Sequence, residues 1–395
     1  EYVYWSIQIV MYPYMTGLVA GAFVLSSLYH VFGVQKLKEI ARYALVFSFA
    51  LLPVAMMPLL LHLSQPFRGI HVLMTPHFTS AISAFGIVFM TYACIVGAEI
   101  WFVYRKFIVD SIHRLNAQSN RSGFESLLLF IYKVISLGAM DTSKEALDSD
   151  HKAVKFLAGL GIPVACFLHG YAGFIFGSVK ANALWMSPLM PVIFIMSAVV
   201  SGIALCMLTY IVIMEGQAFL QRRRGGAELA LATKGAESDI INEATRYLLG
   251  FLVAAISLEL LDLIFRGYTA MKSWDILRSV MYGKDFINIF VLQYTLGNVV
   301  PFVLLILPGR TMKRTVLALL LVLFGVFMMR WNVVIGGQAF SLSFAGYMHY
   351  HIPIIPHSIE TFKEGLFGAL TVVITPFVLF WIINRYVPSL RKDEG

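Results

Sequence analysis

Residues 189–214 read LMPVIFIMSAVVSGIALCMLTYIVIM, a stretch that contains no Lys, Arg, Asp or Glu. A membrane-spanning helix needs roughly 20 consecutive, mostly apolar residues, so this stretch is long enough to cross a bilayer. It lacks the two-residue alternation of a barrel strand, and we therefore interpret it as a helix. Runs of the same kind continue outward in both directions. Together they predict nine membrane-spanning helices, near residues 9–32, 43–63, 79–104, 154–177, 189–214, 245–265, 286–307, 314–335 and 365–387.

The composition agrees with this interpretation. Of the 395 residues, 59% are hydrophobic and 13% are charged, whereas a soluble domain has about 45–50% apolar and about 25% charged residues. We therefore predict an all-α polytopic integral membrane protein. The segment 124–140 is shorter and carries charges, and we interpret it as an amphipathic interfacial helix or part of a loop.

The basic residues predict how the chain is oriented. One set of connections between the nine runs holds 22 Lys and Arg residues, including those of the long segments 105–153 and 215–244, and the opposite set holds 8. Because cytoplasmic loops carry the excess, we expect the sequence to begin outside and end in the cytoplasm, in a cytoplasmic (inner) membrane. Arg222–Arg224 is interpreted as a lipid-headgroup anchor followed by a flexible connection, and nucleic acid is not an expected partner. No Met or signal pattern precedes Glu1, so a tenth helix before it is an expectation.

His169 is the most informative ionisable residue of the first half. It lies deep in the fourth run, where an ionisable side chain is costly and marks a site or a pathway. The alternative is a neutral imidazole that is hydrogen-bonded between helices. His62 closes the second run at a similar depth and is either a site residue or an interfacial histidine. Arg68 follows His62 and is a candidate to bind a quinone carbonyl, a carboxylate or a lipid phosphate.

The sixth run places Glu259, Asp262 and Arg266 on one helical face, because their spacings are three and four residues. Two carboxylates and a guanidinium near the outer boundary indicate either a proton relay or a structural ion network. Arg330, at the outer end of the eighth run, is a candidate partner. The three cysteines lie inside predicted spans without metal-ligand spacing, so no zinc or iron–sulfur site is predicted.

Several segments together resemble the NrfD/polysulfide reductase membrane-subunit family, especially its long branch and the DsrP-like subgroup. The segments that carry the resemblance are residues 14–22, 62–68, 76–78, His169, 185–191 with Ser197 and Gly202, 262–266 and 330–338, of which the last is the most specific. Many members have an Asp where His62 stands, which is a departure from the family pattern. The resemblance implies two four-helix bundles, and we expect the first within 1–177 and the second within 245–395, joined by the span in 178–214.

The resemblance also implies a quinone-reactive subunit of a respiratory oxidoreductase complex, with menaquinone as the expected quinone and with proton translocation as a further expectation. It implies no haem or iron–sulfur cluster in this chain. Expected partners are an outer-face ferredoxin-like iron–sulfur subunit, a multihaem cytochrome c and other membrane subunits. By position, the quinone-site candidates are His169, His62, Tyr14, Arg68, Ser83 and His77. The proton-pathway candidates are Glu259, Asp262, Arg266 and Arg330.

Three other functions stay open at this point. A b-type cytochrome would use His62 and His169 as haem ligands on facing helices. A secondary transporter would use the two bundles as repeats around a midplane site. A structural anchor of a redox complex would carry a degenerate quinone site.

Overall fold

The computed structural model describes residues 5–77, 79–118, 120–223, 227–269, 274–340 and 346–389. These residues contain nine helices that are long and apolar enough to cross a membrane, which confirms the predicted all-α membrane fold. Of the predicted flexible connection, Gly225 and Gly226 lie outside the described residues, and the Ala-rich stretch that follows them is helical, because α9 begins at Ala227. The spanning elements are α1 (Ile7–His30), α2 with α3 (Lys38–Ala55 and Met57–His62), α5 (Ala81–Ala117), α7 (Lys144–Gly177), α8 (Met190–Arg223), α9 (Ala227–Tyr268), η3 with α11 (Ile287–Val299 and Val300–Ile306), α12 with η4 (Met312–Trp331 and Asn332–Gly336), and α14 (Leu366–Tyr386).

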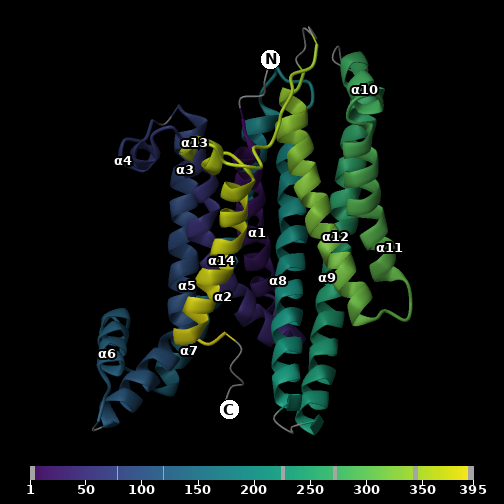
Figure 1. Cartoon of the computed structure of the whole chain (residues 1–395). Coiled ribbons are helices and arrows are strands. Elements are labelled where there is room, and N and C mark those ends of the chain that lie inside the picture. Colours follow the sequence, from purple (N-terminus) through teal and green to yellow (C-terminus); the bar gives the residue numbers. More distant parts are fainter. Residues whose placement is uncertain are drawn as a thin grey trace.

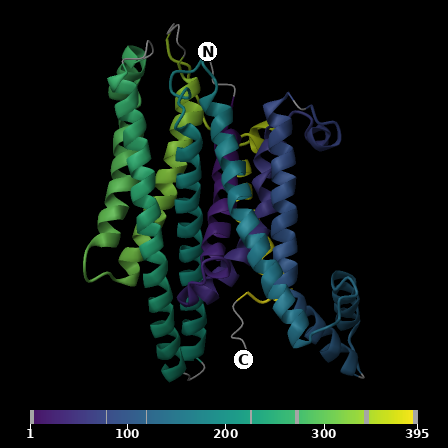
Figure 2. The same cartoon turned by 180° about the vertical axis from the view of Figure 1, so that it is seen from behind.

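The spanning helices run side by side, and short elements cover the two ends of the molecule (Figure 1). One end, here called the α10 end, carries η2 (Pro66–Ile70), α4 (His71–Met74), α10 (Trp274–Tyr282) and α13 (Ile359–Lys363). The opposite end, called the α6 end, carries α6 (Gly123–Ile135), the end of α8 and the start of α9. The short η1 (Gln35–Leu37) links α1 to α2. The central helix α8 contacts α1 and α7 on one side and α9 and α12 on the other (Figure 2).

The last spanning helix packs differently from the expectation. α14 contacts α2, α1 and α3, and Figure 1 shows it on the α2 side of the molecule. The rings of Tyr43 and Phe47 on α2 lie 5.1 and 5.3 Å from the ring of Phe380 on α14. The second group of helices therefore consists of α8, α9, η3 with α11, and α12, rather than of every helix within 245–395. Hydropathy alone does not reveal which neighbour an apolar helix contacts.

α1 is the most enclosed of the spanning helices, and its crossing with α8 depends on glycine. A β-carbon on Gly21 would overlap the carbonyl oxygen of Ala198 and the backbone of Gly202. The two helices thus approach each other backbone to backbone, as small residues permit in membranes.

Proline interrupts two of the spanning elements. The second span changes from α2 to α3 at Met56, between Pro53 and Pro58. The seventh span is π-helical from Ile287 to Val299 and becomes α-helical next to Pro301. Proline lacks a backbone N–H and cannot complete the regular hydrogen-bond ladder, which explains a break at these points.

The two long charged segments are more helical than the sequence suggested. α5 continues to Ala117, α6 follows, and α7 begins at Lys144, so most of 105–153 is helix. α6 begins with a capping box, in which Ser122 accepts from the N–H of Glu125 and Glu125 accepts from the N–H of Ser122. Similarly, α8 extends to Arg223 and α9 begins at Ala227. The capping residues were present in the sequence, but the charges made these segments look like loops.

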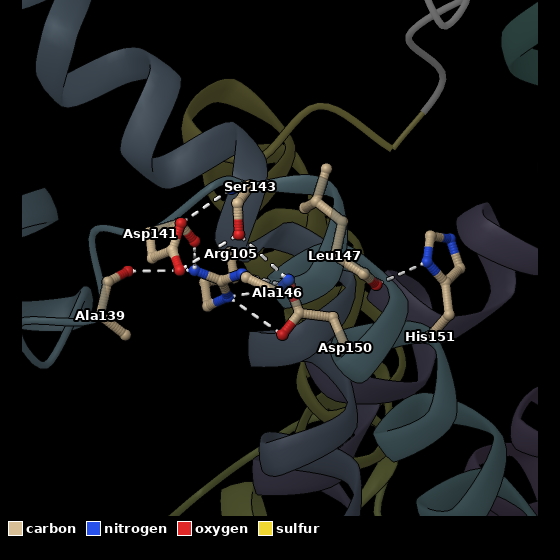
Figure 3. A network of polar contacts seen from close by, with 8 residues as sticks. All are labelled: Arg105, Ala139, Asp141, Ser143, Ala146, Leu147, Asp150 and His151. Atoms are coloured by element: carbon tan, nitrogen blue, oxygen red, sulfur yellow. Dashed lines mark hydrogen bonds and ion pairs between the residues drawn. The ribbon is translucent and has the colours of Figure 1, made fainter.

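One buried ion pair ties α5 to α7 at the α6 end (Figure 3). The Arg105 guanidinium contacts the Asp150 carboxylate through Nε and Nη2, at 2.8 and 2.7 Å. Its Nη1 donates to the carbonyl oxygens of Ala139 and Asp141, at 3.2 and 2.5 Å. The Arg105 side chain therefore pairs with a carboxylate of α7 and also holds the backbone of the connection between α6 and α7 next to the start of α7.

Candidate functional site

Arg330 lies at the centre of the polar interior, near the last turn of α12. It is fully buried. Its Nη2 lies 3.0 Å from Nε2 of His169, 2.8 Å from Oγ of Ser197 and 3.3 Å from the carbonyl oxygen of Phe194. Its guanidinium carbon also lies 3.7 Å from the centre of the Phe194 ring, in cation–π geometry. A single cation thus joins α12, α7 and α8.

The contact with Arg330 defines the protonation of His169. A guanidinium has only N–H donors, so Nε2 of His169 must be the acceptor. The proton of the neutral imidazole then lies on Nδ1, which is buried and has no hydrogen-bond partner among the described residues. The backbone of Gly17 lies against the Cε1–Nε2 edge of the ring, since a β-carbon on Gly17 would come within 3.3 Å of both atoms, and the methyl group of Ala198 lies beside Gly17. His169 therefore presents an unused N–H donor in apolar surroundings.

Tyr14 lies on α1 close to this pair. Its hydroxyl donates to the carbonyl oxygen of Leu323 at 3.1 Å, and its ring packs edge-on against Phe327 at 5.6 Å. Tyr14 and Arg330 are near enough to interact electrostatically. The structure therefore brings together two of the predicted quinone-site residues, His169 and Tyr14, with Arg330 from the predicted proton pathway.

Glu259 lies beside this cluster and is held by amides. Its carboxylate accepts from Nε2 of Gln293 at 3.1 Å and from Nδ2 of Asn298 at 3.0 Å. Gln293 in turn accepts from Nδ2 of Asn332 at 2.8 Å. These partners come from the π-helical segments η3 and η4. Glu259 is also near enough to Arg330 for their charges to interact.

Asp262 and Arg266 form a second polar group one turn further along α9. Arg266 Nε donates to Asp262 at 2.8 Å, and Ser187 donates a hydrogen bond to the same carboxylate. The guanidinium also donates to the carbonyl oxygens of Ala183 and Leu184, at 2.7 and 3.0 Å. This pair ties the connection between α7 and α8 to the end of α9.

A cavity connects the two acidic groups of α9. Its volume is about 80 Å³, and its lining includes Glu259, Asp262, Arg266, Gln293 and Asn332. Most of the remaining lining is apolar, and a cavity of this size has room for several water molecules beside these polar groups. The three residues predicted to share one face of the sixth span, Glu259, Asp262 and Arg266, therefore line the same cavity.

The remaining quinone-site candidates lie at the α10 end. His62 is held by an ion pair in which Nδ1 lies 3.0 Å from Glu364. Arg68 is exposed on η2, and His77 is exposed with its backbone N–H donating to Ser83. His62 thus has its partner Glu364 at the α10 end, whereas His169 has its partner Arg330 in the interior.

Tyr350 completes the α10 end by contacting the start of α1. Its hydroxyl accepts from the backbone N–H of Ile7 at 2.7 Å. Burial raises the pKa of Tyr350 to about 12, because the phenolate would lose solvation.

Sequence reasoning missed several polar residues of the interior. Gln293 and Ser187 each donate to a carboxylate of α9, Asn332 donates to Gln293, and Glu364 contacts His62. The signal in the sequence was an amide or hydroxyl inside an apolar run, which is unusual enough to predict a buried partner. It does not identify that partner.

Comparisons with known proteins agree with this architecture. The sequence model of a family described as polysulphide reductase, NrfD, matches residues 1–342. A selenate reductase subunit of Mesobacillus selenatarsenatis is 28% identical over 341 residues, which cover 85% of this chain and 74% of the relative. A putative dimethyl sulfoxide reductase membrane subunit of Halobacterium salinarum is 26% identical, with coverages of 89% and 71%. The Hdr-like menaquinol oxidoreductase integral membrane subunit of Archaeoglobus fulgidus is 27% identical over 201 residues, 51% of this chain and 40% of the relative.

Proposed function

Since the chain belongs to the polysulphide reductase NrfD family, we propose that it is the quinone-reactive membrane subunit of a multi-subunit respiratory oxidoreductase. Two similar proteins are named as subunits of reductases, one of them as a membrane subunit, and a third is named as a menaquinol oxidoreductase subunit. These names support a membrane subunit of a redox complex, and the third supports menaquinone as the quinone.

The observation that carries the proposal is the free Nδ1–H of His169. A buried N–H without an acceptor costs about 1–3 kcal/mol, so a fold that keeps one is expected to use it. A quinone carbonyl is an acceptor that reaches the interior from the lipid phase. The Arg330 side chain keeps the imidazole in the tautomer that donates from Nδ1.

The surroundings of His169 fit a quinone in chemistry. A quinone site needs apolar walls for the ring and a small number of polar groups for the carbonyls. Around the imidazole, Gly17 and Ala198 give apolar contact, and Arg330 adds a fixed positive charge. A bound quinone would supply the two-electron redox chemistry. This chain would bind it, orient it and hold a proton at Nδ1 of His169.

The second group of helices offers a route for protons. We assign this role to Glu259, Asp262, Arg266 and Arg330, because three of them line the cavity of about 80 Å³ and the fourth interacts with Glu259. Water in this cavity would connect the α9 carboxylates, while the amides of η3 and η4 hold Glu259 in place. Proton translocation through this group is part of the proposal.

The α10 end is the proposed docking face for an iron–sulfur partner. Its apolar side chains Phe67, Met74, Ile355 and Ile359 are 69–95% exposed. Exposed apolar residues gathered at one end mark an interaction site. Because the opposite end carries the excess of basic residues, we propose that the α10 end faces the outside of the cytoplasmic membrane.

The test replaces His169 with Ala in the whole complex. Quinone-dependent electron transfer should be lost while the subunits still assemble. The matched control is His113→Ala, because His113 is an exposed histidine of α5 at the α6 end. Normal turnover by the His169→Ala complex would contradict the assignment, and so would an equal loss in His113→Ala.

A further inference from the structure

Glu99 is a buried carboxyl group that the proposed site does not use. It lies in the middle of α5, and its side chain is fully buried. Neither of its carboxylate oxygens has a hydrogen-bond partner among the described residues. An ionised carboxylate in that situation loses its hydration without compensation, so the protonated form is the stable one. Glu259, which is also buried, differs because two amides donate to it.

The nearest ionisable neighbour of Glu99 is His30, the last residue of α1. Nδ1 of His30 lies 3.7 Å from Oε1 of Glu99, just beyond hydrogen-bond distance. The same nitrogen lies 3.0 Å from Oγ and 3.1 Å from the carbonyl oxygen of Ser26. The His30 side chain is 10% exposed, whereas that of Glu99 is fully buried. A small side-chain movement would therefore join the imidazole to the carboxyl group.

A third titratable group extends this series to the surface. His151 on α7 is exposed at the α6 end, beside the Arg105–Asp150 ion pair (Figure 3), and it interacts electrostatically with His30. Of the other charged or titratable neighbours, Arg42 on α2 interacts with His30, and Tyr92 on α5 interacts with Glu99. Exposure thus decreases from His151 through His30 to Glu99.

We propose that Glu99 is a proton-binding site that is held as a neutral carboxylic acid and exchanges its proton with the α6 end through His30. The exchange breaks an O–H bond at Glu99 and forms an N–H bond at His30, or the reverse, and no electron moves. His151, which is exposed at the α6 end, is the entry group of this series. Only the fate of the proton rests on the proposed function, in which quinone reduction would consume it.

Infrared spectroscopy of the whole complex in lipid tests the protonation state. The unchanged protein should show a carboxylic acid C=O band that moves to lower wavenumber in D₂O. Glu99→Gln should remove this band, and Glu99→Asp should move it. Glu259→Gln serves to separate any signal from the second buried glutamate. If Glu99→Gln left the carboxylic acid region unchanged at every pH tested, the proposal would be overturned.

The rate of hydrogen–deuterium exchange of the same band tests the route. His30→Ala should slow the exchange, while the matched variant His113→Ala should not, because His113 is an exposed histidine of α5 at the same end. Equal exchange rates in these two variants would contradict the role of His30. The band does not require a bound quinone, so it separates this inference from the proposed function. If the complex binds no quinone but still shows the Glu99 band, only the proposed function is contradicted.

Discussion

Replacing His169 by Leu or by Gln separates two roles of its imidazole. Leu removes both the acceptor for Arg330 and the free N–H. Gln offers a side-chain oxygen that accepts from Arg330, but it does not reproduce the ring or its Nδ1–H. The two variants should therefore differ in stability and agree in function.

The magnitude follows from the contacts of Arg330. A hydrogen bond to a charged group contributes about 1.5–3 kcal/mol. The same Nη2 still has Ser197 and the carbonyl oxygen of Phe194 as acceptors when His169 is lost. We therefore expect His169→Leu to lower stability by about 1–2 kcal/mol, the lower part of that range. His169→Gln should lose less than half of this amount.

The assay pairs thermal unfolding of the complex in lipid nanodiscs with measurement of quinone-dependent electron transfer. Both variants should lose electron transfer, and only the Leu variant should unfold at a clearly lower temperature. The reasoning would be refuted if the Gln variant were as unstable as the Leu variant. It would also be refuted if either variant kept normal turnover.

Three further predictions concern other parts of the chain. Gly21→Leu should destabilise the protein by about 1–3 kcal/mol or prevent folding, because the new side chain overlaps α8; Gly97→Ala, at a glycine with open space around it, should have little effect on thermal unfolding. Glu259→Leu should lower the free energy of unfolding by about 1–3 kcal/mol for each of the two buried amides that lose their acceptor. Glu259→Gln should lower it less, and an equal decrease in the unfolding temperature of the two variants would contradict this account. The folded-state pKa of Tyr350 is raised to about 12 from the usual 10.0, so its contribution to stability should be complete below pH 10 and lost as the pH rises toward 12. Over that interval, the denaturant midpoint of Tyr350→Phe should decrease less than that of the unchanged protein. The same decrease in both proteins would speak against the assignment.

Much of the fold was predictable because it follows from hydropathy. A bilayer cannot hydrogen-bond to an exposed backbone, so an apolar run of sufficient length has to become a helix. The lateral order of these helices was not predictable in the same way. α14 packs against α2 through rings such as Phe380 and Tyr43, and nothing in either apolar run specifies that partner. An amphipathic helix was one of the two alternatives for 124–140, and α6 (Gly123–Ile135) agrees with it. The extension of α5 to Ala117 and the start of α7 at Lys144 were missed because the charged residues made these stretches look like loops.

The candidate site was predictable residue by residue but not as an arrangement. His169, Glu259 and Arg330 stood out because ionisable groups are rare inside apolar runs. The contact between His169 and Arg330 joins residues 161 positions apart, so no local pattern could reveal it. The helical spacing predicted only that Asp262 and Arg266 share one face, since side chains four residues apart are neighbours on a helix; their contact at 2.8 Å came from the structure.

The most direct test of the central claim is to extract lipids from the purified complex and identify bound quinone by mass spectrometry, alongside an optical spectrum of the isolated subunit. We expect menaquinone in the unchanged complex, a large decrease in the His169→Leu complex, and no haem absorption from this subunit. Equal quinone content in the two complexes, or a haem Soret band from the subunit, would contradict the account.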